Sequence, residues 1–328
     1  MIRAAALAVA LLSAGAFPSV HAEISDVKDV HAAFAAQRYD EIEALYDKVL
    51  RERRRAADGR FQSEVFLGNL PWYSDDDPAS ESYWPKVDAA TAAWLAHSPG
   101  SPLAAMVRAH VLARRGNRLS AIGRWKEVDA LVAEARRLLA GAREQGKRDA
   151  NWHAVRLRVL GVEGVPREDV LDAIHAAAAV DPYPLRPWQF AALALSPDGR
   201  STGDLPWLMR LAVERTRTTE GTTMYARVLA SAYWHFPHLA AHPFGHDALD
   251  WNVAHRSFTE LKQRYPEGYE PNLHGALACL AGDRAVTAAA LAQAGAYARE
   301  DVWKIWGGDK HLARCRAWST GEAQGPRA

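Results

Sequence analysis

Several histidines in one short stretch have the spacing and side-chain type to hold a metal ion. They are His235, His238, His242 and His246, with His255 close behind. Imidazole nitrogen is a common ligand of zinc and copper, but Pro237 and Pro243 oppose the unbroken helix that would place these rings on one face. Residues 235–255 therefore have two interpretations: a zinc or copper site, or a histidine-bearing loop between helices.

Two other stretches resemble catalytic motifs. The segment Gly199–Gly203 matches the G-x-S-x-G pattern of a hydrolase, with Ser201 at the position of the nucleophile. That chemistry needs a strand before the serine, whereas the preceding apolar run has helical spacing and Asp204 is placed to cap a following helix. Residues 141–148 nearly match a phosphate-binding loop, but Arg148 stands where Mg²⁺ binding requires Ser or Thr. A hydrolase is retained only as a further alternative.

Aromatic and acidic residues gather in one irregular segment. It contains Trp72, Tyr73, Asp75, Asp76 and Asp77. Aromatic faces stack on sugars and clustered carboxylates can bind Ca²⁺, although the spacing is not that of an EF-hand. The segment is interpreted either as a binding loop on a rigid scaffold or as a solvated loop.

The two cysteines, Cys279 and Cys315, could form one disulfide in an oxidising compartment. Cys279 lies in an apolar stretch typical of a buried helix face, and Cys315 lies in the last helical segment. Two buried thiols are an equally good interpretation. Because spacing does not fix the Cα separation, both alternatives stay open.

The elements that would position these residues are predicted to be helices. Apolar residues recur with a helical period along the chain, and strand-like alternation is nearly absent. Ser101 followed by Pro102 predicts a capped helix start, and Gly116 predicts the end of that helix. The expected helices cover residues 26–37, 40–50, 80–97, 102–116, 125–140, 151–160, 166–180, 188–195, 205–218, 224–236, 247–265, 269–281, 284–294 and 310–318.

Short turns between successive helices favour an array of antiparallel helix pairs. Phrases similar to tetratricopeptide repeats occur at residues 34–45, 176–182 and 277–292, although no clean repeat of about 34 residues runs through the chain. The predicted fold class is all-α, as a tetratricopeptide-like α-solenoid or an array of antiparallel helix pairs.

The mature chain also resembles a bacterial helical family, domain of unknown function 4034. The resemblance is carried by residues 38–50, 94–102, 152–159, 181–183, 221–234, 250–266 and 279–283. These stretches contain helix starts, turns and packing residues. The resemblance implies a helical fold and, because the family has no assigned catalytic residues, no residue roles.

The N-terminus predicts export. Arg3, an apolar run over residues 4–17 and the small residues before position 23 form a secretory signal that is expected to be cleaved after Ala22. Residues 23–320 are expected to form the helical domain, which could divide near 141–150, and residues 321–328 a disordered tail. The apolar run is shorter than the ~20 residues needed to span a bilayer, so no transmembrane segment is expected after cleavage.

Charge and composition point to a binding role. Removal of the signal takes Arg3 from the 40 Lys and Arg residues and none of the 39 Asp and Glu residues, so the mature chain has no net charge and no general reason to bind nucleic acid. The leading hypothesis is an exported, non-enzymatic scaffold without cofactors, more often periplasmic than extracellular, that binds a protein or peptide of the cell envelope. The alternative is a protein that binds a metal or small ligand through residues 235–255.

Overall fold

The structure is a computed structural model that describes residues 27–70, 82–196, 203–235, 249–295, 300–304 and 306–322. This part of the chain is helical and contains no β-strand, apart from an isolated bridge between Arg55 and Phe61. The all-α prediction is therefore confirmed.

The helices have the following bounds, in chain order. Those of the first half are α1 (Val27–Ala35), α2 (Tyr39–Glu52), α3 (Gln62–Gly68), α4 (Tyr83–His97), α5 (Pro102–Ala121), α6 (Trp125–Gly141), α7 (Arg143–Gly146), α8 (Ala150–Glu163) and α9 (Arg167–Val180). Those of the second half are α10 (Leu185–Leu195), α11 (Leu205–Glu220), α12 (Thr223–His235), α13 (Trp251–Arg264), the 3₁₀ turn η2 (Pro266–Gly268), α14 (Pro271–Leu280), α15 (Arg284–Ala294), α16 (Glu300–Lys304) and α17 (Asp309–Thr320).

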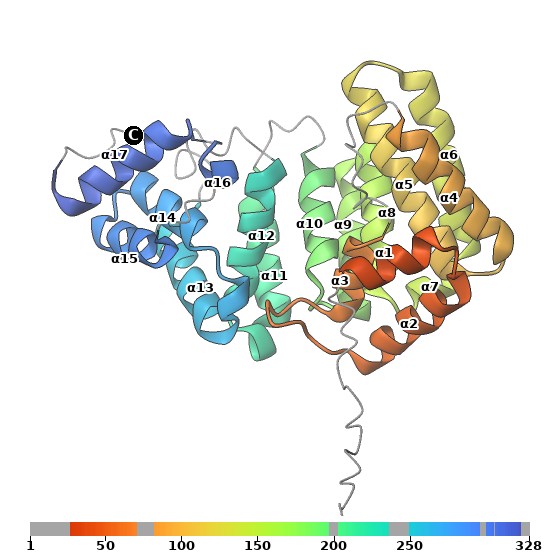
Figure 1. The fold of residues 1–328 in the computed structure, drawn as a ribbon, viewed down its shortest axis with the longest axis horizontal. Helices are drawn as coiled ribbons and strands as arrows, with labels where there is room; N and C mark the ends of the chain where they lie inside the picture. The colour runs from red at the N-terminus through yellow and green to blue at the C-terminus, as the bar shows by residue number, and fades with distance from the viewer. Residues whose placement is uncertain are drawn as a thin grey trace, which may run out of the picture.

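The helices form an elongated array (Figure 1), and their contacts arrange most of them in two adjoining rows. In one row, α5 contacts α8, α8 contacts α10, α10 contacts α12, and α12 contacts α13. The second row packs on the first through α6, α9 and α11, each against the helix that precedes or follows it in the chain. At the C-terminal end, α14 packs against α15, and α17 packs against both.

The N-terminal segment lies across the first row instead of extending it (Figure 1). Tyr46 of α2 bonds to Asp149 at the start of α8, and Glu64 of α3 bonds to Arg186 of α10. Further along, Arg55 forms an ion pair with Glu220 at the end of α11. The segment therefore covers part of one face of the first row.

The buried apolar side chains form two large clusters that meet at α8. Trp152, Val155 and Val159 belong to the cluster formed with α1–α6, whereas Ala154 and Leu157 belong to the cluster that continues to α17. An α-helix has about 3.6 residues per turn, so these two sets of side chains lie on different faces of α8. One helix thus contributes to both cores.

Of the three helix ends predicted from capping residues, one is confirmed and two differ. Ser101 Oγ accepts a hydrogen bond from the amide of Ala104, with Pro102 at the first helical position, which confirms that start. Gly116 does not end α5, which continues to Ala121, and a Cβ at Gly116 would lie 3.0 Å from Val162 Cγ1. This glycine allows α5 and α8 to approach closely.

The second difference is at α11, where Asp204 makes no side-chain cap. Its carboxylate instead forms a bidentate pair with Arg167, with the closer guanidinium nitrogen 2.6 Å from Oδ1. Helices α3, α7 and α16 lie outside the helices expected from the sequence. Within the described ranges, no helix is both long enough and apolar enough to cross a membrane.

Candidate functional site

A buried carboxylate at the start of α8 takes part in a hydrogen-bond network that joins four elements. Asp149 is 1% exposed and caps α8, where Oδ1 accepts the amide hydrogen of Asn151 at 2.8 Å. Its Oδ2 accepts hydrogen bonds from the Tyr46 hydroxyl at 2.7 Å and from Gln145 Nε2 at 3.1 Å. Asn151 Nδ2 in turn donates to Ser63 Oγ at 3.4 Å. These contacts connect α2, α3, α7 and α8.

Burial has a direct electrostatic consequence at this group. Removing the carboxylate from water raises the pKa of Asp149, and the hydrogen bond from Tyr46 is the largest opposing effect. The same burial, followed by the charge of Asp149, raises the pKa of Tyr46 well above its usual value. The pair therefore keeps its proton on the tyrosine, which acts as donor and not as a base.

A second buried carboxylate belongs to α3. Glu64 Oε1 accepts the backbone N–H of Arg186 at 2.8 Å, and Oε2 accepts that of Phe61 at 3.3 Å. The Arg186 guanidinium donates to the Glu64 carbonyl at 2.9 Å. Burial raises the pKa of Glu64, and the contacts with Arg186 oppose the shift. Glu64 thus fixes α3 against the first turn of α10.

Asn151 and Arg186, which bond to these two carboxylates, line a small cavity, with an empty volume of about 240 Å³ that includes space open to solvent. Its lining is mostly apolar, with three polar residues. The lining residues are Leu67, Met106, Val107, His110, Asn151, Ala154, Val155, Arg186 and Phe190. Burial lowers the pKa of His110 well below its usual value, as do the nearby charges of Arg158, Arg186 and Arg114.

The charges beside this cavity are predominantly positive. The Arg158 guanidinium lies 5.0 Å from the centre of the Phe190 ring, and burial together with Arg114 and Arg186 lowers the pKa of Arg158 to about 9. Asp149 and Glu64 are both held by several donors. The cavity therefore combines a structural hydrogen-bond network with cations and contains no nucleophile paired with a base.

A second polar network fixes the segment between α2 and α3 to the later helices. Glu220 is fully buried, pairs with Arg55, and accepts hydrogen bonds from Thr223 Oγ1 at 3.2 Å and Tyr265 Oη at 3.3 Å. Arg227 donates to the carbonyl of Asp58 at 2.8 Å. The backbone at Gly59 packs tightly against the Arg227 guanidinium, because a Cβ added at this position would overlap it. This network has a structural role.

His255, from the predicted histidine-rich stretch, pairs with a histidine that sequence reasoning missed. Its Nδ1 lies 3.2 Å from His274 Nε2, and the other nitrogen of His274 lies 2.9 Å from the Tyr269 hydroxyl. Burial, and then the charge of His255, lowers the pKa of His274 to about 3. With His274 neutral, Tyr269 can donate to Nδ1 while Nε2 donates to His255. The three residues form a directional hydrogen-bond chain.

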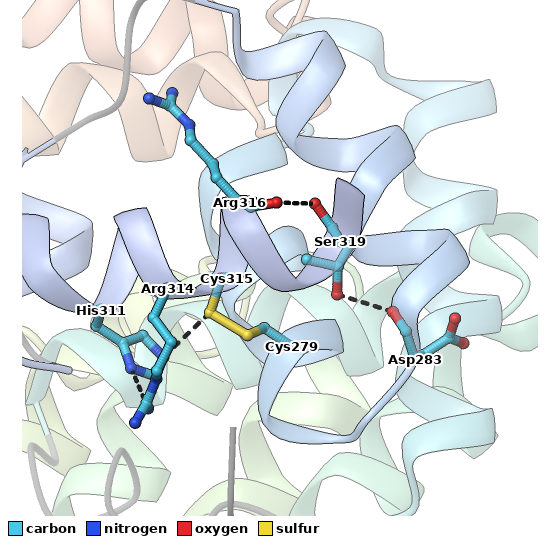
Figure 2. The surroundings of a disulfide bond; sticks show 8 residues. Cys279, Asp283, His311, Arg314, Cys315, Arg316 and Ser319 are labelled. Atoms are coloured by element: carbon cyan, nitrogen blue, oxygen red, sulfur yellow. Dashed lines mark hydrogen bonds between the residues drawn. A yellow bond between two sulfur atoms is a disulfide. The ribbon is translucent and has the colours of Figure 1, made fainter. Parts of the chain in front are cut away.

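The two cysteines are joined in the structure by a disulfide between α14 and α17 (Figure 2), with Cα atoms 5.9 Å apart. His311 Nε2 lies 3.5 Å from the Cys315 sulfur, and an Arg314 guanidinium nitrogen lies 2.8 Å from His311 Nδ1. Because arginine only donates, His311 Nδ1 must accept and the neutral ring carries its proton on Nε2. Burial and Arg314 both lower the pKa of His311.

Cys279, His311 and Cys315 have the donor types and proximity of a metal site, with their ligand atoms within 4.8 Å of one another. The bonding argues against that role. The sulfurs are bonded to each other, and His311 Nε2 holds the proton that a metal would have to replace while Nδ1 is already used by Arg314. The arrangement fits a buried structural disulfide.

The remaining predicted site residues cannot be placed. The binding-loop residues lie outside the described part of the chain: Trp72, Tyr73, Asp75, Asp76 and Asp77. So do Ser201, His238, His242 and His246, and the side chain of His235 is not described either. The predicted metal, loop and hydrolase sites therefore stay predictions.

Sequence reasoning missed the residues that organise the cavity and the networks. They are Tyr46, Glu64, Asp149, Arg186, Glu220 and His274. One signal was available: Asp149 directly precedes a helical segment, which is the position of an N-cap. Tyr46, Glu64, Arg186 and Glu220 gain their roles from partners more than 100 residues away; Glu64 and Arg186, for example, are 122 residues apart. His274 pairs with His255 of another helix, 19 residues away.

Comparison of the chain with protein-family models, with curated proteins and with solved structures found no significant match in any of the three.

Proposed function

We propose that this protein is an exported scaffold of tetratricopeptide-like helix pairs that binds another protein or peptide of the cell envelope. The observation that carries the proposal is the row in which α5, α8, α10 and α12 contact one another in order, backed by α6, α9 and α11. Such rows give α-solenoids their extended binding surfaces. The likeness to solenoids is one of fold, and the resemblance to domain of unknown function 4034 adds no residue roles.

Two further observations support the proposal. The disulfide between Cys279 and Cys315 suits an oxidising compartment, in which an exported chain would fold. The described buried carboxylates Asp149, Glu64 and Glu220 are each held by several donors that tie helices together. These carboxylates therefore stabilise the fold. Their structural role favours a binding protein over an enzyme.

The N-terminal segment limits where a partner would bind. It already contacts α8, α10 and the end of α11. We expect the partner to use the part of the first row that keeps exposed area, which includes the half-buried Leu193 of α10 and Ala230 of α12.

The test is site-specific photocrosslinking in the native host. A photoreactive amino acid would replace Leu193 or Ala230 in the first row, and the matched controls would carry it at the exposed Asp172 or Glu214 in the second row. The proposal expects the same exported partner to be captured from both first-row positions and from neither control. Two outcomes would contradict the proposal: equal capture of the partner from all four positions, or no captured partner although the photoreactive amino acid is efficiently incorporated.

A further inference from the structure

The turn between α5 and α6 exposes two large hydrophobic side chains. Ile122 is 64% exposed and Trp125 is 59% exposed, and no other large hydrophobic side chain in the described ranges is exposed. The turn projects from one end of the array, at the far side from α17 (Figure 1). To bury these two projecting side chains, a partner must offer either a concave surface or a deformable one such as a lipid bilayer.

The backbone holds this turn in one shape. Gly123 has φ +75°, a left-handed conformation that favours glycine. Its amide donates to the Ser120 carbonyl at 3.0 Å, and the Arg124 amide donates to the Leu119 carbonyl at 3.0 Å. Leu119 and Val128 on either side are buried. Ile122 and Trp125 therefore cannot turn inward without unwinding the ends of both helices.

Cations surround the two apolar side chains. The chain from Arg115 to Asp129 contains four basic residues, with Arg118, Arg124 and Lys126 beside the turn, against the two acidic residues Glu127 and Asp129. Arg124 forms an ion pair with Glu127, in which Nη2 and Oε2 are 2.6 Å apart. Lys126 and Arg118 are exposed beside the turn. The projection thus combines apolar side chains with an excess of basic over acidic residues.

We propose that the α5–α6 turn is a membrane-contact site that inserts Ile122 and Trp125 into the interface of an anionic phospholipid bilayer. Tryptophan is enriched at membrane–water interfaces, where its apolar ring and polar N–H are both satisfied. Nearby cations attract anionic headgroups. This site is separate from the first-row surface proposed for a protein partner, so the two proposals can fail independently.

The test is flotation of the purified mature chain with vesicles of phosphatidylglycerol and phosphatidylcholine, compared with vesicles of phosphatidylcholine alone. Binding is expected only with phosphatidylglycerol, and it should weaken as salt rises from about 0.05 to 0.5 M because screening shortens the reach of surface charges. The double variant I122S/W125S should bind about tenfold or more weakly, and Lys126→Glu should also bind more weakly. Thermal melting identical to that of the wild type would show that each variant is folded.

A second readout separates membrane insertion from simple charge attraction. Trp125→Phe keeps an aromatic ring and should still float with the vesicles. Brominated lipid should quench part of the fluorescence of the wild type, and that part should be missing in Trp125→Phe. Unchanged flotation of I122S/W125S would overturn the proposal. So would capture of a protein instead of lipid by a photocrosslinker at Ile122.

Discussion

At the scale of single residues, the most constrained group is Asp149, whose two oxygens accept three hydrogen bonds while 1% of the residue is exposed. A buried acceptor that loses its donor costs more than the bond is worth, because the group is left desolvated. The carboxylate and the Tyr46 hydroxyl should therefore be energetically coupled.

We predict that Asp149→Ala lowers the free energy of unfolding by about 3 kcal/mol and Tyr46→Phe by about 1–2 kcal/mol. Urea denaturation measures both. The double variant should lose less than the sum, since each change removes the same hydrogen bond. The neighbouring Asp47→Ala is the control, because its side chain is 52% exposed, and it should change stability by less than about 0.5 kcal/mol. Strict additivity would show that the bond contributes little.

At the scale of helices, the disulfide determines how α17 is attached. It closes a loop between residues 36 apart in sequence and joins two cysteines with no exposed surface. Leu312 of α17 packs with them into the main core, and the partly buried Trp318 packs against it. A short helix with few core residues depends strongly on such a covalent link.

We expect the double variant C279S/C315S to lose about 4 kcal/mol of stability, the value that loop-closure entropy gives for a loop of this size. Trypsin should then cleave the chain before α17 while the rest of the protein resists digestion. Wild-type protein treated with a thiol reductant under mild denaturant should behave in the same way. A reduced protein with unchanged stability and digestion would mean that packing alone holds the helix.

Helices were predictable from sequence to the extent that their signals are local. The capped start at Ser101 depends on two adjacent residues and was found. Gly116 was read as a stop because glycine commonly ends helices, but its role is set by Val162, which no local pattern reveals. Helix α3 has only 7 residues, too few for a periodic signal, and it is stabilised by distant partners of Glu64.

The candidate site was less predictable than the helices for the same reason. The cavity is lined by residues from α3, α5, α8 and α10, and which residues meet depends on how the N-terminal segment lies across the rows. His255 was noted in the sequence, yet its partner His274 is 19 residues away on another helix. Spacing could not reveal that pair.

At the scale of the whole molecule, buried histidines make stability depend on pH. Burial is the main cause that lowers the pKa of His110, His153, His274 and His311. Below pH 6.5 the unfolded chain binds protons that the folded chain excludes, so stability falls as pH falls. The raised pKa values of Glu64 and Asp149 act in the opposite sense, because these carboxyls take up protons more readily when folded.

His274 allows a direct test, because its pKa of about 3 places the window between pH 6.5 and about 3. Stability should fall across this window by about 1.4 kcal/mol per pH unit for this residue alone. We predict that His274→Asn is less stable at pH 7 but loses about 2 kcal/mol less than the wild type between pH 6.5 and 5. His175→Asn, at an exposed position of α9, is the matched control. Equal slopes for all three proteins in urea titrations would contradict the prediction.

The path of the N-terminal segment also has a consequence for biogenesis. Arg55 pairs with Glu220, 165 residues later, and Asp58 accepts a hydrogen bond from Arg227, 169 residues later. At a synthesis rate of about 5–20 residues per second, this segment would wait roughly ten seconds or more for its partners. During that time Phe66, which is buried in the finished fold, lacks the part of its core cluster that later residues such as Trp152 and Val159 supply. The nascent chain should therefore need a chaperone for its N-terminal segment, whereas α17 near the other end is held by the disulfide.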